Sequence, residues 1–251
     1  MFIDTHLHLV NEDYDIDSVI TRAKESDVNY LIVSGSDLFD NRLNKNFLSK
    51  FSNVFLSVGF HPSCAKDVTD DDFLFLEEMI SLDKVVAIGE IGLDYHYGKT
   101  DREEQIRIFE RQLEIAVKYN LPVVIHTRDA FYDTYNILKK YDVRGVIHCF
   151  SGSLEVAKEY LSLGFYLGIG GVVTFKNSKL KHIVKEIGLD KIVLETDSPY
   201  LSPFRGEKNE PCNVKYIASF LSDLLGITLE EVAMVTTGNA CTLFDLDLHM
   251  W

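Results

Sequence analysis

The sequence lacks the features of several protein classes. Its four cysteines, Cys64, Cys149, Cys212 and Cys241, include no C-x-x-C pair, which argues against a disulfide framework and against a thiolate zinc site. No window reaches the roughly 18 uninterrupted apolar residues of a membrane-spanning helix, and the N-terminus has neither the basic nor the long apolar segment of a signal peptide. We therefore expect a soluble protein of the reducing cytoplasm with no membrane partner.

Basic residues are also scarce. Lys and Arg total 25 against 39 Asp and Glu, which gives a formal net charge of −14. Such a surface repels polyanions and anionic membranes, and this excludes a protein that coats DNA through a broad basic face. Hydrophobic residues make up 46% and charged residues 25% of the 251, proportions that are typical of a globular protein with a full core.

Short apolar runs alternate with longer amphipathic stretches along the whole chain. Eight runs predict strands, at residues 2–5, 30–34, 54–58, 85–89, 122–126, 145–149, 165–169 and 192–196. Residues 101–119 show helical spacing, and residues 228–235 with 239–244 are expected to close the fold. Eight strand–helix units in about 250 residues predict an α/β fold, a single (β/α)8 TIM barrel that spans residues 1–251. An open doubly wound sheet is the alternative.

Polar side chains stand at the carboxyl ends of the predicted strands. In a parallel barrel these ends meet on one face, where barrel enzymes place their chemistry. The first run leads into a His-x-His pair, whose two side chains project to the same side of an extended segment. Six residues are predicted to converge in this way: His6, His8, Glu90, His126, His148 and Asp197.

Each of these residues has an ordinary alternative, as a core histidine, a solvated aspartate or a capping carboxylate. Together, four imidazoles and two carboxylates aimed at one point would repel one another or stay unpaired without cations between them. Two divalent ions resolve this conflict. Such a pair, about 3.5–4 Å apart, lowers the pKa of a bridging water and clamps the attacking and leaving oxygens of a displacement. The pattern therefore predicts hydrolysis.

Seven segments spread along the chain resemble the TatD family of metal-dependent deoxyribonucleases, in the amidohydrolase superfamily. They read DTHLH from residue 4, GFHP from 59, GEIGLDY from 89, PVVIHTRDA from 122, HCFSG from 148, LETDSPY from 194 and NEP from 209. The resemblance implies that one ion is held by His6, His8 and Asp197. It implies that a second is held by His126 and His148, and that Glu90 bridges the two. Magnesium is the metal that the family implies, whereas imidazole-rich ligation also suits zinc or manganese.

The activity that the resemblance implies is hydrolysis of DNA phosphodiester bonds, as a 3′–5′ exonuclease with single strands or 3′ ends as substrate. In this hypothesis a metal-activated water attacks the phosphorus, with Asp197 as general base and Glu90 as the second catalytic residue. Three residues in mouth loops are candidates for binding substrate: His61, Arg128 and Arg205.

Three aromatic residues near the predicted mouth, Tyr95, Phe150 and Tyr200, are candidates for stacking on bases. Two other functions stay open. One is an amidohydrolase that acts on a small amide, lactone or phosphate ester, because the same barrel supports many substrates through its loops. The other is a noncatalytic binding module that keeps a closed metal site for structure.

Overall fold

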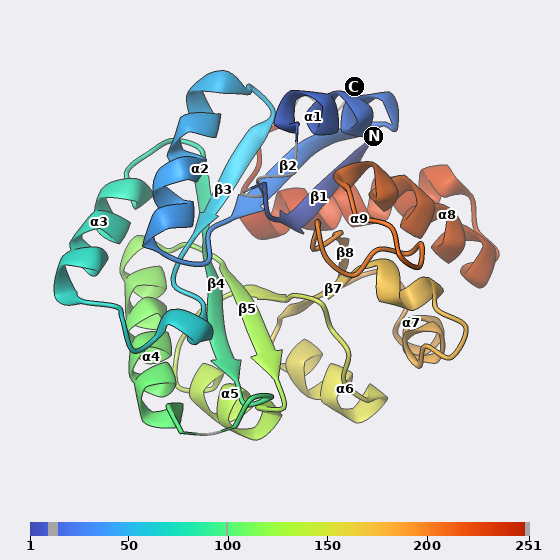
Figure 1. The fold of residues 1–251 in the computed structure, drawn as a ribbon. Helices are drawn as coiled ribbons and strands as arrows, with labels where there is room; N and C mark the ends of the chain where they lie inside the picture. Colours follow the sequence, from blue (N-terminus) through green and yellow to red (C-terminus); the bar gives the residue numbers. More distant parts are fainter. Residues whose placement is uncertain (10–14, 99, 249–251) are drawn as a thin grey trace.

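The computed structural model describes residues 1–9, 15–98 and 100–248. Its eight strands are parallel and pair in sequence order, so the chain passes around the barrel as the colours run in Figure 1. The predicted TIM barrel is confirmed. The strands are β1 (Phe2–Leu7), β2 (Val28–Ser34), β3 (Val54–Val58), β4 (Val85–Asp94), β5 (Val123–Arg128), β6 (Gly145–Ile147), β7 (Tyr166–Ile169) and β8 (Ile192–Leu194).

Helices follow the strands and surround them (Figure 1). They are α1 (Ile16–Glu25), α2 (Leu38–Lys50), α3 (Asp70–Ile80), α4 (Arg102–Tyr119), α5 (Phe131–Leu138), α6 (Leu154–Ser162), α7 (Leu180–Ile187), α8 (Val214–Leu225) and α9 (Leu229–Phe244), with short 3-10 turns η1 (Pro62–Cys64), η2 (Gly171–Thr174) and η3 (Pro211–Asn213). Reciprocal capping boxes begin α3 at Thr69 and α9 at Thr228. Among the described residues no helix combines the length and apolar content needed to cross a membrane.

Helix α9 covers the amino-terminal end of the barrel. Side chains of alternate strand residues such as Ile3 and Val124 cluster with Leu243 and Phe244 of this helix. The amide of Asn239 donates to carbonyls at the start of β8. The predicted closing segments 228–235 and 239–244 are thus parts of one helix. Helix α9 thus covers one end of the barrel. A cavity opens at the other end, among residues at the carboxyl ends of the strands.

A seam of hydrogen bonds joins β1 to the segment after β8. The backbone N–H of His8 donates to Ser198 O at 2.8 Å, and that of Asp197 donates to His6 O at 2.9 Å. Asp4 is buried at this seam, where its carboxyl accepts the backbone N–H and the hydroxyl of Thr196. Burial raises the pKa of Asp4 well above its ordinary value. The seam places the His-x-His pair directly beside Asp197.

Several strands end at other residues than the sequence predicts. β4 continues five residues further, to Asp94, so Glu90 lies inside the strand rather than after it. The reason is the pairing with β5, which places Gly92 opposite His126 and Asp94 opposite Arg128. Backbone hydrogen bonds extend the strand here although the residues are polar. β6 and β8 end earlier than predicted, so both His148 and Asp197 lie in loops.

Candidate metal centre

The structure gathers the six predicted ligands at the carboxyl ends of the strands. Five of them line a cavity of about 660 Å³, and the sixth, His6, is fully buried beside it. Two predicted substrate-binding residues, His61 and Arg128, line the same cavity. Arg205 lies on the exposed loop after β8, outside the lining. The geometry therefore joins eight of the nine predicted residues and leaves Arg205 apart.

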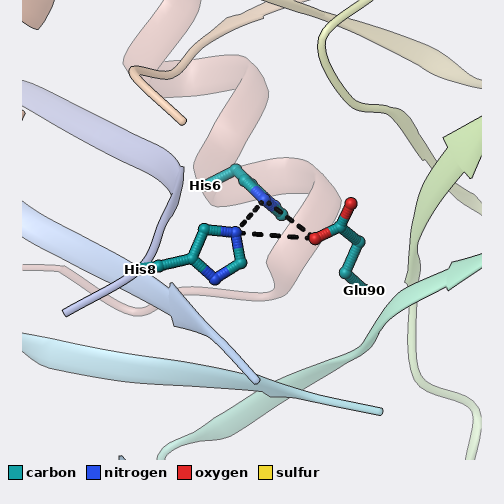
Figure 2. Close-up of side chains that lie close together, drawn as sticks. All are labelled: His6, His8 and Glu90. Carbon is teal, nitrogen blue, oxygen red and sulfur yellow. Dashed lines mark hydrogen bonds and ion pairs between the residues drawn. The ribbon is translucent and has the colours of Figure 1, made fainter. Parts of the chain in front are cut away.

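Four donor atoms from three parts of the chain form one compact group. Figure 2 shows the rings of His6 and His8 facing a single oxygen of Glu90. Their two Nε2 atoms are 3.3 Å apart, and each lies 3.5 Å from Glu90 Oε2. Asp197 Oδ1 lies 3.5 Å from His6 Nε2 and 3.6 Å from His8 Nε2.

These distances test whether the residues fit a metal ion. Four ligands about 2.1 Å from a tetrahedrally bound ion lie about 3.4 Å from one another. The five distances that involve the Nε2 atoms of His6 and His8 are 3.3–3.6 Å, which is the spacing of donor atoms around one such ion. Two imidazoles with two carboxylates are a donor set that zinc, manganese and related divalent ions accept. The group fits a divalent cation.

A second group shares the other oxygen of Glu90. His126 Nδ1 lies 2.8 Å and His148 Nε2 lies 2.9 Å from Glu90 Oε1, and the two ring nitrogens are 3.4 Å apart. These three atoms face the cavity, and His61 Nε2 lies 3.6 Å from the same Glu90 Oε1. Three protein ligands with an open position are typical of catalytic rather than structural metal sites.

Ser34 orients the two histidines of β1. Its hydroxyl lies 3.0 Å from His6 Nδ1, and its carbonyl oxygen lies 3.2 Å from His8 Nδ1. A carbonyl only accepts hydrogen bonds, so His8 carries a proton on Nδ1. The lone pair of its neutral form is therefore on Nε2, the atom that faces Glu90. No motif in the sequence indicates this role of Ser34, because one of its two contacts is made by its backbone carbonyl, which every residue has.

Asp94 holds the ring of His126 from the side opposite Glu90. Its Oδ2 lies 3.0 Å from His126 Nε2, while His126 Nδ1 faces Glu90. A carboxylate behind a ligand histidine fixes its tautomer and raises its basicity. Asp94 belongs to the GEIGLDY segment, but the sequence does not reveal its role, because the contact depends on the continued pairing of β4 with β5.

Replacing Asp94 by asparagine is expected to weaken metal binding about 10- to 100-fold, because the amide no longer holds the Nε2 proton of His126 with a charged acceptor. Metal titration against a competing chelator measures the effect. Asp129→Asn is the matched control, since Asp129 is exposed and forms an ion pair with His96. Wild-type affinity in Asp94→Asn would show that His126 needs no such support.

His61 faces the site as a donor rather than as a ligand. Its Nδ1 accepts the backbone N–H of Ser63 at 3.1 Å, so the proton of the neutral ring is on Nε2. Nε2 lies 3.6 Å from Glu90 Oε1. Burial lowers the pKa of His61 to about 4, which keeps the ring neutral at physiological pH. A neutral N–H directed into the cavity suits a bound anionic oxygen better than a metal ion.

Burial and neighbouring charges shift the pKa values of the histidines in the site in opposite directions. Burial lowers the pKa of His6 to about 4. Burial also acts against the charged form of His8 and His126, but hydrogen bonds to carboxylates outweigh it and raise the pKa of each to about 9. The pKa of Glu90 lies well below its ordinary value: burial raises it, and the surrounding imidazoles more than reverse that effect. Glu90 is thus ionised beside the protonated rings of His8 and His126 in the metal-free protein.

Metal binding is expected to release protons and to strengthen with pH. His8 and His126 hold their protons below a pKa of about 9, whereas a bound cation needs the deprotonated nitrogen. Affinity should therefore rise between about pH 7 and pH 9, as proton competition falls. Calorimetric titration in buffers of different ionisation enthalpy counts the released protons. Heats that do not depend on the buffer, with affinity constant across this range, would contradict the prediction.

Comparison with known proteins agrees with this geometry. The family model described as TatD related DNase matches residues 3–245. The chain belongs to the TatD family. A Bacillus subtilis (strain 168) relative of this TatD-family chain, named uncharacterized metal-dependent hydrolase YabD, is 44% identical over 98% of the chain and 100% of its own length. A Mus musculus relative named putative deoxyribonuclease TATDN3 is 33% identical over 96% of the chain and 87% of its own length.

A solved structure of a TatD family member is also closely similar. The crystal structure of YJJV, a TatD homologue from Escherichia coli K12, superposes with a TM-score of 0.92 at 29% identity and covers 98% of both chains. Family membership and the donor groups together place the chain among the metal-dependent hydrolases.

Proposed function

We propose that this TatD-family chain is a deoxyribonuclease that hydrolyses DNA phosphodiester bonds, as a 3′–5′ exonuclease acting on single strands or 3′ ends. The observation that carries the proposal is the sharing of Glu90: one carboxylate oxygen faces His6 and His8, and the other faces His126 and His148. Two adjacent cations suit the displacement at a phosphodiester. The family description and the name of the mouse relative support DNA as the substrate.

In this proposal the two donor groups would hold two divalent ions. His6, His8 and Asp197 would hold one, His126 and His148 would hold the other, and Glu90 would serve both groups. Bound divalent cations neutralise phosphate charge and lower the pKa of water. Family resemblance favours magnesium, and the four imidazoles also suit zinc or manganese.

Asp197 accepts the proton of the attacking water. Burial raises its pKa, but the hydrogen bond from His8 and the neighbouring imidazole charges lower the pKa below its ordinary value overall. Asp197 is therefore ionised at neutral pH and has an oxygen available at the cavity wall. Glu90 acts with it by holding the four ligand imidazoles in place.

Two side chains bind the phosphate in this proposal. The Nε2–H of His61 donates to one nonbridging oxygen, as its tautomer allows. Arg128 lines the same cavity and supplies a guanidinium with paired donors. Arg205 lies outside the lining, and its part in binding the substrate stays a prediction.

Asp40 favours a second candidate function. It lines the cavity and is partly buried, and burial raises its pKa above the ordinary value. A carboxyl at this wall disfavours additional phosphates and suits a smaller substrate. The second candidate is thus an amidohydrolase that acts on a small amide, lactone or phosphate ester.

Metal-titrated hydrolysis of end-labelled single-stranded DNA tests the proposal, beside a panel of small esters, amides and lactones. We expect metal-dependent shortening of DNA from the 3′ end, at a rate about 10²- to 10⁴-fold lower with Asp197→Asn protein. Turnover of a small ester with intact DNA would establish the second candidate. Inactivity on every substrate despite bound metal would indicate a binding module.

A further inference from the structure

Exposed aromatic side chains gather at the open end of the barrel. Among the described residues seven Phe and Tyr side chains are exposed: Phe39, Tyr97, Tyr119, Tyr132, Phe175, Tyr200 and Tyr216. Six of them lie on loops or first helical turns that follow the carboxyl ends of strands, and the exception, Tyr119, ends α4 at the opposite end. A single exposed ring is ordinary, but six on segments that follow the carboxyl ends of strands make this end of the barrel its aromatic end.

Tyr97 is the most exposed of these side chains, at 89%. It follows β4, which runs beside β5 with its carboxyl end at the same edge (Figure 1). The guanidinium carbon of Arg128, at the end of β5, lies 5.7 Å from the centre of the Tyr97 ring, within cation–π range. Arg128 also lines the cavity, so it connects the exposed ring with the candidate metal centre.

A second ring stands across the opening. Tyr200 lines the cavity, is 60% exposed, and packs edge-on against His8 with 6.1 Å between ring centres. Tyr97 follows β4 and Tyr200 follows β8, and these strands are four apart in the order of eight. In a barrel they lie on opposite sides of the axis. Aromatic rings therefore flank the cavity on two sides.

The charge of the chain limits how this face can hold a polynucleotide. With a net charge of −14, the protein surface gives little of the counterion-release affinity that basic proteins have for nucleic acid. Stacking of bases on aromatic rings needs no such charge, tolerates any base, and is strengthened by arginine. The ring of Tyr97 lies beside the guanidinium of Arg128, which lines the cavity. These are the groups of which a base-stacking subsite is made.

We propose that Tyr97 and Arg128 form a stacking platform for a nucleobase of the strand whose phosphate lies at the candidate metal centre. The proposal rests on the proposed function for the identity of the polynucleotide. Arg128 covers one side of the tyrosine ring, and the exposed remainder receives the base. Affinity for DNA then depends on the presence of bases and not on phosphates alone.

The test compares a labelled single-stranded oligonucleotide with an abasic sugar–phosphate oligomer of the same length. Fluorescence anisotropy with chelator present gives Kd without turnover, and hydrolysis by the metal-loaded protein gives KM and kcat. We expect Tyr97→Ala to raise Kd and KM for the oligonucleotide about 10-fold, with kcat and the Kd for the abasic oligomer unchanged. Tyr97→Trp should restore binding, and Tyr119→Ala, at the opposite end of the barrel, should bind as the wild type does.

Each contrary result has a distinct meaning. Unchanged Kd in Tyr97→Ala, or an equal loss on the abasic oligomer, overturns the platform even if DNA is cleaved. Base-dependent binding that Tyr97→Ala removes, by a protein that does not cleave DNA, supports the platform and refutes the nuclease. Because Tyr97 is almost fully exposed, its replacement leaves the core unchanged.

Discussion

Asp197→Asn is expected to lower turnover by about 10²- to 10⁴-fold while the fold stays intact. The asparagine amide cannot accept the proton of the attacking water, and general-base contributions have this size. Asp197 has a positive φ of 56°, a conformation that asparagine tolerates better than most residues. Asparagine therefore removes the charge with little backbone strain. End-labelled DNA hydrolysis measures the loss, and circular dichroism verifies the fold.

A matched control separates this effect from a general change of charge. Asp129 also has a positive φ, of 55°, but it is exposed and pairs with His96. Asp129→Asn should therefore keep wild-type turnover. Undiminished hydrolysis by Asp197→Asn, or wild-type rates in metal-stripped buffer, would refute the mechanism.

Glu90→Gln is expected to lose the paired cations, with binding weakened by more than about 100-fold and hydrolysis lost with it. Each oxygen of Glu90 faces one donor group, and its buried charge stabilises four surrounding imidazoles. Glutamine has nearly the same shape but no charge, so both groups lose their shared anion. Replacing a supporting residue alone costs about 10- to 100-fold, and a shared ligand should cost more.

Metal analysis after dialysis measures this loss. The exposed Glu207, on the loop after β8, provides the control Glu207→Gln, which should retain the metal content of the wild type. Two full equivalents of metal in Glu90→Gln would show that Glu90 is not the shared ligand and would remove the main support for a paired centre.

The sequence predicted the main parts of the site because each part is recognised from a short segment, a strand or its carboxyl end. Residues two apart on a strand share a side, and the Nε2 atoms of His6 and His8 do face one point. Strand ends of a parallel barrel meet on one face, and Glu90, His126 and His148 meet there. Their roles as ligands stay predictions until metal is measured.

Other features could not be derived from the sequence. Arg205 lies on the loop after β8, and it is outside the cavity lining although Asp197 and Tyr200 of the same loop are part of it, because the path of a loop does not follow from periodicity. The roles of Ser34 and Asp94 depend on which atoms face the two sides of a histidine ring. Those contacts depend on register between strands that are separated along the chain.

The sequence alone determined the kind of protein: eight alternating units that make a barrel, and a set of imidazoles and carboxylates at its open end. Periodicity and side-chain chemistry are properties of short segments, and so they can be recognised without the fold. Only the tertiary structure decided which nitrogens face Glu90, how Asp94 holds His126, and how far apart the donor atoms lie. These features arise from the pairing of β4 with β5 and from the seam between β1 and the segment after β8. The seam brings residues nearly two hundred positions apart into contact.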